Sequence, residues 1–235
     1  MTHLDFERYK ILTFDCYGTL IDWESGFFSA LRPILAAHGK SISDAQLLEM
    51  YGELEAQAEQ GEFRRYRDVL QVVVSGFGKQ LGFEPTDQEK RSLPESMSNW
   101  VPFADTVQAL ERLKSKFKLA VISNVDDDLF TASAQKLKIK FDHVITAQQA
   151  GCYKPGMKIF NLALQTIGIP PEQVLHCGQS IYHDVIPAQS LGLSTVWVNR
   201  PTPRAGVGAV KAASGRPDLE VPNLKTLANL AVSGN

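Results

Sequence analysis

The feature that most constrains the fold is a set of five short apolar runs, four of which are preceded by residues with helical patterning. The runs are Ile11–Phe14, Lys118–Ile122, His143–Thr146, Val174–Cys177 and Thr195–Val198. They are mostly continuous and do not alternate with polar residues, which is typical of strands buried on both faces of a parallel sheet. Alternation of such strands with helices predicts an α/β fold with a doubly wound sheet.

The first and second runs are separated by about a hundred residues, far more than a normal crossover connection needs. Helical patterns fill this segment, and two candidate capping boxes mark helix starts, at Ser43 with Gln46 and at Thr86 with Glu89. We therefore predict a helical cap domain (residues 21–101) inserted into a Rossmann-like core (residues 1–20 and 102–235). The alternative is that these helices pack directly on the core.

Two further segments follow the last run. Residues 201–218 are rich in Gly, Pro and Ala, which predicts a loop. A short helix is expected from Leu224 to Val232.

Composition narrows the functional classes. With 24 basic and 26 acidic residues the net charge is −2, so the basic excess of a nucleic-acid-binding protein is missing and no nucleic-acid partner is expected. Three cysteines predict no disulfide framework, which favours a cytoplasmic location. The charged N-terminus does not resemble a signal peptide, and no apolar run approaches the roughly 20 residues of a membrane span.

Polar residues follow four of the predicted strands. Asp15 directly follows the first, Ser123 and Asn124 follow the second, Lys154 lies several residues past the third, and Asp184 lies past the fourth. Ligands bind at the carboxyl ends of strands in an open parallel sheet, so we expect these side chains to meet there.

These residue types suit nucleophilic catalysis. A carboxylate such as Asp15 can form a covalent intermediate, and a nearby cation such as Lys154 keeps it ionised. Hydrolysis of the resulting ester requires an oriented water, a role that suits Asp184. Each residue also has an ordinary explanation, since a strand-end Asp is often only a helix cap.

Four strings in the chain resemble the motifs of the haloacid dehalogenase superfamily, in order and across nearly the whole sequence. They are "FDCYGTL", "VISN", "YKPG" and "CGQSIYHD". The helical insertion after the first motif resembles the cap domain of that superfamily.

Two positions depart from the magnesium-dependent phosphatases that make up most of this superfamily. Tyr17 stands where phosphatases have a second Asp as general acid, and Gln179 replaces an Asp that helps to bind magnesium. An amide is a weaker magnesium ligand than a carboxylate. The resemblance is therefore to the 2-haloacid dehalogenase branch, and it implies no metal and no other cofactor.

The resemblance also implies individual roles. Asp15 would displace the leaving group at C2 of a small carboxylic acid, Lys154 would neutralise Asp15, and Asp184 would activate water. Ser180, inside the fourth motif, joins these catalytic residues. The expected substrate-binding residues are Tyr17, Trp23, Arg67, Ser123 and Asn124, with Ser123 on the substrate carboxylate, Asn124 near the halide and Arg67 completing the halide pocket.

Several alternatives stay open at this stage. The motif strings are also similar to those of azetidine-2-carboxylate hydrolase, whose leaving group is a ring amine, and the motifs cannot decide between the two. A phosphatase with a relaxed metal site and a non-catalytic binding protein are further alternatives. Trp23, Phe27, Tyr66 and Trp100 are candidates for either the pocket or the core. A homodimer is compatible with the sequence.

Overall fold

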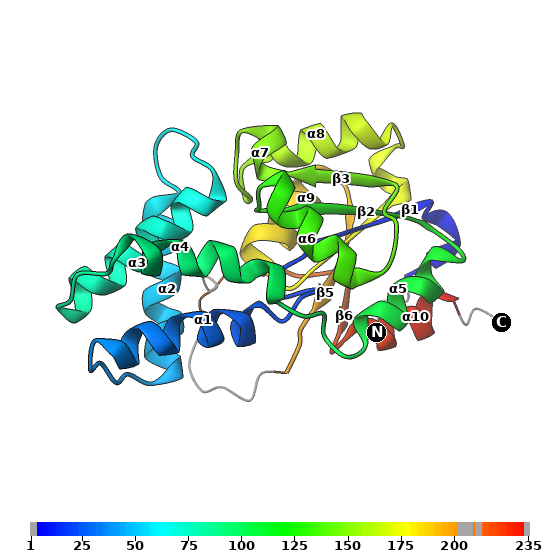
Figure 1. Ribbon diagram of the computed structural model, residues 1–235. Coiled ribbons are helices and arrows are strands. Elements are labelled where there is room, and N and C mark those ends of the chain that lie inside the picture. Colours follow the sequence, from blue (N-terminus) through cyan, green and yellow to red (C-terminus); the bar gives the residue numbers. More distant parts are fainter. Residues whose placement is uncertain (1–3, 202–208, 210–212, 233–235) are drawn as a thin grey trace.

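A computed structural model of the chain describes residues 4–201, 209 and 213–232. Its centre is a six-stranded, all-parallel sheet in the order β3-β2-β1-β4-β5-β6 (Figure 1). The strands are β1 Ile11–Phe14, β2 Lys118–Ser123, β3 His143–Thr146, β4 Val174–Gly178, β5 Ser194–Val198 and β6 Leu219–Val221. All five predicted strands are confirmed to within one residue. The edge strand β6 was not expected, because it has only three residues and Glu220 at its centre is exposed.

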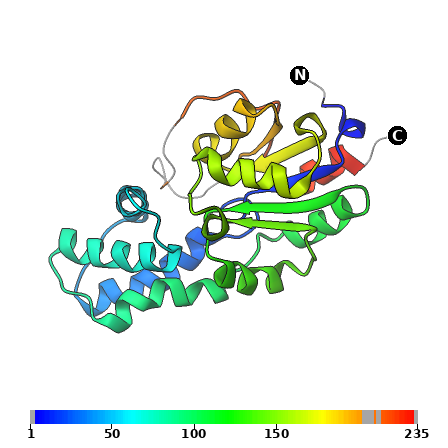
Figure 2. The ribbon, with the colours of Figure 1, turned by 90° about the horizontal axis from the view of Figure 1, so that it is seen from above.

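Helices cover both faces of the sheet, which confirms the doubly wound α/β class (Figure 2). On one face lie α5 (Thr106–Lys114) and α6 (Asp127–Leu137), with α10 (Leu224–Val232) packed against α5. On the other lie α8 (Met157–Ile167) and α9 (Ile186–Ser190). The terminal helix has the predicted bounds. Much of the predicted loop at residues 201–218 (202–208 and 210–212) lies outside the described residues.

The strand order fixes where a ligand can bind. From β1 the chain continues outward through β2 to β3, and then returns to place β4 on the other side of β1. The neighbouring β1 and β4 therefore form the point at which the winding reverses, and the crevice outside their carboxyl ends is the usual ligand site of such sheets.

The segment between β1 and β2 forms helices that lie beyond one end of the sheet (Figure 1). They are α1 Trp23–Ala37, α2 Asp44–Ala58, α3 Tyr66–Leu81 and α4 Asp87–Ser96, followed by a turn at Met97–Asn99. We call α1–α4 the helical insertion. Its helices pack against one another, α2 on α3, α3 on α4 and α4 on α1, around the buried ring of Phe27, which contacts Phe28, Tyr51 and Phe77. The domain boundaries at residues 20/21 and 101/102 stay predictions.

Both predicted capping boxes are present. Ser43 and Gln46 exchange side-chain and backbone hydrogen bonds at the start of α2, and Thr86 and Glu89 do the same at the start of α4. Each box satisfies two backbone N–H groups that a helix start otherwise leaves without partners.

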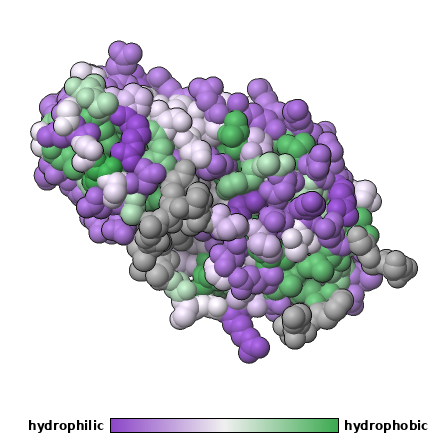
Figure 3. Space-filling view, turned by 90° about the horizontal axis from the view of Figure 1, so that it is seen from below, coloured by the Kyte–Doolittle hydropathy of each residue, from purple (hydrophilic) through white to green (hydrophobic). Residues whose placement is uncertain are grey.

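Apolar side chains are scattered over the described surface. On the face shown in Figure 3, hydrophobic residues lie in small groups among hydrophilic ones. The large exposed apolar side chains are scattered over separate elements: Val72, Val101, Met157, Ile186 and Leu230. None of the described helices is long and apolar enough to cross a membrane. The homodimer stays a prediction.

A buried carboxylate joins the insertion to the sheet. Asp126, just after β2, accepts hydrogen bonds from the backbone N–H groups of Tyr66 (2.9 Å) and Arg67 (3.1 Å) at the start of α3. The preceding residue, Arg65, makes no capping bond of its own. The first turn of an insertion helix is thus capped by a residue from the sheet.

We expect Asp126→Ala to lower the free energy of unfolding by about 2 kcal/mol or more, because it removes a cap and leaves buried N–H groups without partners. Asp128→Ala is the matched control. Its carboxylate also pairs with Arg67 but is 62% exposed, whereas the Asp126 side chain is 0% exposed. An exposed ion pair contributes at most about 1 kcal/mol. Urea unfolding compares the two variants, and equal losses of stability would contradict a capping role for Asp126.

Candidate active site

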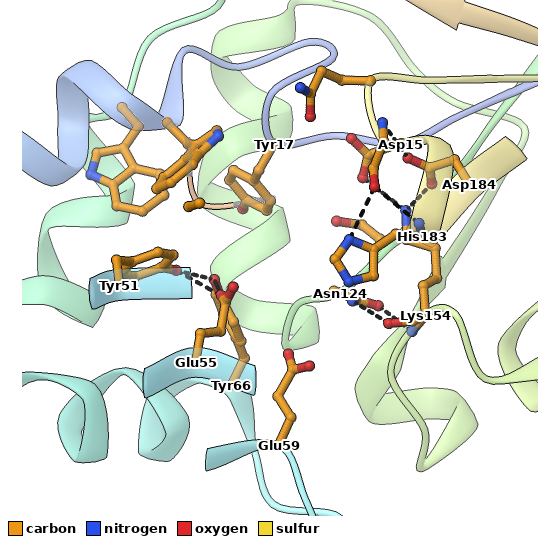
Figure 4. A pocket seen from close by; sticks show the side chains of 16 residues that line it. Asp15, Tyr17, Tyr51, Glu55, Glu59, Tyr66, Asn124, Lys154, His183 and Asp184 are labelled. Atoms are coloured by element: carbon orange, nitrogen blue, oxygen red, sulfur yellow. Dashed lines mark hydrogen bonds and ion pairs between the residues drawn. The ribbon is translucent and has the colours of Figure 1, made fainter. Parts of the chain in front are cut away.

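A cavity of about 100 Å³ lies between the carboxyl ends of the strands and the helical insertion (Figure 4). A single water needs roughly 10–15 Å³ of such volume, so the cavity suits a small molecule. The lining residues from the sheet side are Asp15, Tyr17, Ser123, Asn124, Lys154, Gln179, Ser180, His183 and Asp184. Those from the insertion and its surroundings are Trp23, Tyr51, Glu55, Glu59, Tyr66, Trp100 and Ala209.

Ala209 packs against the helical insertion at Gly52. A Cβ atom at Gly52 on α2 would lie 2.2 Å from the carbonyl oxygen of Ala209, closer than any real contact. The absence of a side chain at residue 52 therefore allows Ala209 to approach α2 at the cavity wall.

Asp15 leaves the end of β1 with its carboxylate held on both oxygens. Its backbone N–H continues the sheet by donating to Cys177 (3.0 Å). Lys154 Nζ donates to Oδ1 (2.8 Å), and Thr19 Oγ1 donates to Oδ2 (2.7 Å). Burial and the nearby Asp184 charge raise the pKa of Asp15, and Lys154 opposes this rise. Sequence reasoning missed Thr19, although it lies in the first motif.

Lys154 is the centre of the site. Its ammonium is 2% exposed and donates to Asp15 Oδ1, to Asp184 Oδ1 (2.7 Å) and to the carbonyl of Ile122 (3.0 Å). These three acceptors match the three protons of an ammonium. Burial opposes the charge, but Asp15 and Asp184 outweigh it and raise the pKa of Lys154 above its ordinary value.

Asn124 positions Lys154. Its Oδ1 accepts from the backbone N–H of Lys154 (2.6 Å), and its Nδ2 donates to the carbonyl of the same residue (3.1 Å). Asn124, which was expected near the halide, therefore lines the cavity, but both polar atoms of its side chain are hydrogen-bonded to the backbone of Lys154.

Asp184 is oriented by a turn of π-helix, Ile181–Val185, that directly follows β4. Its Oδ2 accepts from the backbone N–H of Ser180 (3.2 Å), and its Oδ1 also lies 3.3 Å from Nε2 of His176. Burial raises the pKa of Asp184, but Lys154 and His176 together lower it by a larger amount, so the pKa of Asp184 lies below its ordinary value. A Cβ at Gly178 would lie 2.4 Å from Asp184 Cγ, so only glycine leaves room there.

Two residues of the fourth motif support this turn. Ser180 accepts from the backbone N–H of His183 (2.9 Å), and its hydroxyl lies 3.2 Å from His183 Nδ1. Burial lowers the pKa of His183 to about 4, so its imidazole is neutral at neutral pH. The structure therefore brings Asp15, Lys154, Ser180 and Asp184, which were predicted to be catalytic, together at one cavity, and His183 also lines it.

Aromatic rings form one wall of the cavity. Trp23 packs against Phe27 and Tyr51, and Tyr17 meets Trp100 edge to face. The Tyr17 hydroxyl lies 2.9 Å from Ser133 Oγ. Burial raises the pKa of Tyr17 well above its ordinary value, so the hydroxyl is a poor acid. Of the aromatic residues left open by the sequence, Trp23, Tyr66 and Trp100 line the cavity, and Phe27 lies in the core.

Ser123 is buried at the end of β2 and lines the same cavity. Its Oγ has no hydrogen-bond partner within the part of the chain that the structure describes. A buried hydroxyl without a partner is costly, so this group is available to a ligand.

Arg67 does not line the cavity. Its side chain pairs with Asp126 and Asp128 and borders a separate hollow with Gln71 and Arg91. The sequence offered three neighbouring arginines at the start of a helix, and the fold directs this one away from Asp15.

The insertion instead presents two carboxylates that sequence reasoning missed. Glu55 lies on α2, where it accepts from the hydroxyls of Tyr51 and Tyr66, and Glu59 lies one turn further along, at the C-cap of α2. The spacing of residues 51, 55 and 59 along one helix face was the available signal. Among the described residues, no group of three or more His, Cys, Asp or Glu side chains is placed to hold a metal ion.

Comparisons with known proteins agree with this fold. The fold matches a solved L-2-haloacid dehalogenase with a TM-score of 0.80 at 21% identity, covering 96% of this chain and 100% of the other. It also matches the L-2-haloacid dehalogenase of Xanthobacter autotrophicus with chloropropionic acid covalently bound, with a TM-score of 0.78 at 22% identity and coverage of 94% and 98%. At these identities the matches show the fold.

Sequence comparison gives the family. The chain is 25% identical to the (S)-2-haloacid dehalogenase of Pseudomonas fluorescens over 225 residues, which span 94% of this chain and 95% of the relative. Residues 9–192 match the family model described as haloacid dehalogenase-like hydrolase. Because this match covers well over half of the chain, the protein belongs to the haloacid dehalogenase-like hydrolases.

Proposed function

We propose that this hydrolase is an (S)-2-haloacid dehalogenase, which replaces the halogen at C2 of a small carboxylic acid with a hydroxyl group. One observation carries the proposal. The Asp15 carboxylate faces the cavity while Lys154 holds it in place, and the residue two positions later is a tyrosine whose hydroxyl lies against Ser133. The relatives named as 2-haloacid dehalogenases support it over nearly the full length of the chain.

In the first step, Asp15 attacks C2 as its carbon–halogen bond breaks. The halide leaves with the bonding electron pair, C2 is inverted, and an ester joins Asp15 to the substrate. A halide needs no proton to leave, which suits a site where Tyr17 replaces a general acid. Ser123 is placed to donate to the substrate carboxylate, because its buried hydroxyl is otherwise without a partner.

In the second step, water attacks the carbonyl carbon of the Asp15 ester. Asp184 accepts a proton from this water and returns it to the alkoxide as the acyl carbon–oxygen bond breaks. The 2-hydroxy acid leaves, and the regenerated Asp15 carboxyl group loses its proton to solvent. Lys154 acts in both steps, since its ammonium stays fixed while negative charge moves between the substrate, Asp15 and Asp184.

Oxygen labelling tests the covalent step. In a single turnover of (S)-2-chloropropionate in heavy-oxygen water, with enzyme in excess, the product should carry light oxygen that comes from Asp15. Under multiple turnovers the product should carry heavy oxygen, which serves as the internal control. Asp15→Asn should be inactive. Heavy oxygen in the first-turnover product would show that water attacks C2 directly.

Replacing Lys154 tests the ion triad. We expect Lys154→Met to lower kcat about a hundredfold or more, since a preorganised charge is lost. It should also destabilise the protein at neutral pH by about 3–5 kcal/mol, because two buried carboxylates lose their partner. The control is Lys158→Met, whose side chain is exposed on α8 and should leave both quantities nearly unchanged.

The stability difference should depend on pH. In the wild type the pKa of Asp184 lies below its unfolded value, so its stabilisation is present above about pH 4 and is lost as the pH falls. In the variant without Lys154, protonation at low pH neutralises the buried carboxylates, so the cost of burying their charges disappears. Urea unfolding should therefore show a smaller gap between wild type and Lys154→Met near pH 3 than near pH 7. A gap that grows on acidification would contradict this account.

Metal dependence separates this function from a phosphatase. Tyr17 and Gln179 replace two carboxylates of the magnesium phosphatases, so turnover of (S)-2-chloropropionate should survive EDTA and should not rise with added magnesium. Hydrolysis of p-nitrophenyl phosphate should stay near background under both conditions. Strong activation by magnesium, with phosphate ester as the better substrate, would favour the phosphatase.

A further inference from the structure

The charges that line the cavity do not suit a simple anion. Lys154 is the only cationic side chain among the described lining residues, because His183 is neutral at neutral pH, and Asp15 and Asp184 already share its ammonium. On the opposite side of the cavity lie Glu55 and, one turn away, Glu59 (Figure 4). A substrate that carries only a carboxylate would enter a space with more negative than positive charge.

Glu55 accepts hydrogen bonds from two tyrosines at the cavity wall. The hydroxyls of Tyr51 and Tyr66 both donate to its Oε1, each at 2.7 Å. The two tyrosine hydroxyls also lie 2.9 Å from each other, so the three side chains form one hydrogen-bonded cluster. Burial raises the pKa of Glu55, and the two tyrosine hydroxyls oppose this. No described residue forms an ion pair with Glu55.

Glu59 adds a second carboxyl group without a partner. The residue is half-buried, and its side chain forms neither a hydrogen bond nor an ion pair with the described residues. Burial and the Glu55 charge raise its pKa to about 9. At neutral pH Glu59 is therefore mostly protonated in the empty cavity, and a cation bound between the two side chains would favour the ionised form of both.

A second observation, the unpaired hydroxyl of Ser123, points to a ligand in the same cavity. Ser123 is 0% exposed and its Oγ is unpaired, although it lines the cavity with Asp15. This hydroxyl can donate to the carboxylate of a substrate, whereas the carboxyl groups of Glu55 and Glu59 suit a cationic, hydrogen-bond-donating group such as an ammonium. The cavity therefore offers complementary ends for two different groups of one small molecule.

We propose that the substrate is zwitterionic: a small 2-substituted carboxylic acid that also bears a protonated amine, with the carboxylate at Ser123 and the ammonium at Glu55 and Glu59. This inference rests on the proposed function, and it names the substrate class within it. The two glutamates and their tyrosine partners act as specificity residues and take no part in bond breaking.

Binding of unreactive acids tests the inference. Calorimetry compares 3-aminopropionate, 4-aminobutyrate and 5-aminovalerate with propionate, butyrate and valerate. At neutral pH and low ionic strength, at least one amino acid should bind the wild type about tenfold or more tightly than its uncharged counterpart, since close charge pairs shielded from water give at least this factor. The three chain lengths cover the unknown separation of the two charges.

Variants assign the effect to the insertion. The double variant Glu55→Gln with Glu59→Gln should lose the preference, while Glu53→Gln, which changes an exposed residue of the same helix, should keep it. Glu59→Gln alone removes no hydrogen bond, so it reports on binding even if the double variant folds poorly, and it should weaken the preference. Equal or tighter binding of the uncharged acids by the wild type, or a preference that survives both substitutions, would overturn the inference.

Turnover separates this inference from the proposed function. If (S)-2-chlorobutyrate is dehalogenated through an Asp15 ester but the enzyme does not prefer the amino acids, the inference of a zwitterionic substrate is wrong and the proposed dehalogenase activity is supported. If the amino acids bind as expected and no 2-haloacid reacts, the proposed dehalogenase activity is wrong and the inference of a zwitterionic ligand is supported.

Discussion

The buried ammonium of Lys154, placed between Asp15 and Asp184, is the interaction on which the rest of the site depends. Two buried carboxylates that both contact one group cannot both stay ionised unless that group is a cation. The desolvation of three charged groups is expensive, and such networks contribute less to stability than apolar packing of the same volume. The triad therefore makes sense as a preorganised electrostatic device, retained for chemistry more than for folding.

The fold supplies the means to hold this cation still. Ile122 at the end of β2 provides its third acceptor, and Asn124 binds both backbone polar groups of Lys154. Thr19 fixes the other oxygen of Asp15, while the turn after β4 orients Asp184. Because these contacts come from neighbouring strand ends, the arrangement exists before substrate binds. A charge that is already oriented requires no reorganisation as the reaction proceeds.

The sequence by itself determined the α/β fold and which polar residues meet at the strand ends. Continuous apolar runs identified β1–β5 because strands buried on both faces cannot carry alternating polar residues. The polar residues after those runs identified Asp15, Ser123, Lys154 and Asp184, because parallel strands deliver their carboxyl ends to one edge. Capping boxes located the starts of α2 and α4 because their hydrogen bonds are local. The short β6 carries no such signal, since its pairing with β5 depends on the completed sheet.

Only the tertiary structure decided which side of the cavity carries which charge. Arg67 follows Tyr66 in sequence, yet the start of α3 is held by Asp126 so that Arg67 faces away from Asp15. Glu55 is an ordinary surface-like residue in the sequence, and it becomes part of the cavity because α2 packs with that face toward the sheet edge. Helical periodicity tells which residues share a face, but the neighbour of that face is set by contacts between distant segments. The position of Asp15 at a strand end could therefore be predicted from the sequence, whereas the carboxyl groups on the opposite side of the cavity could not.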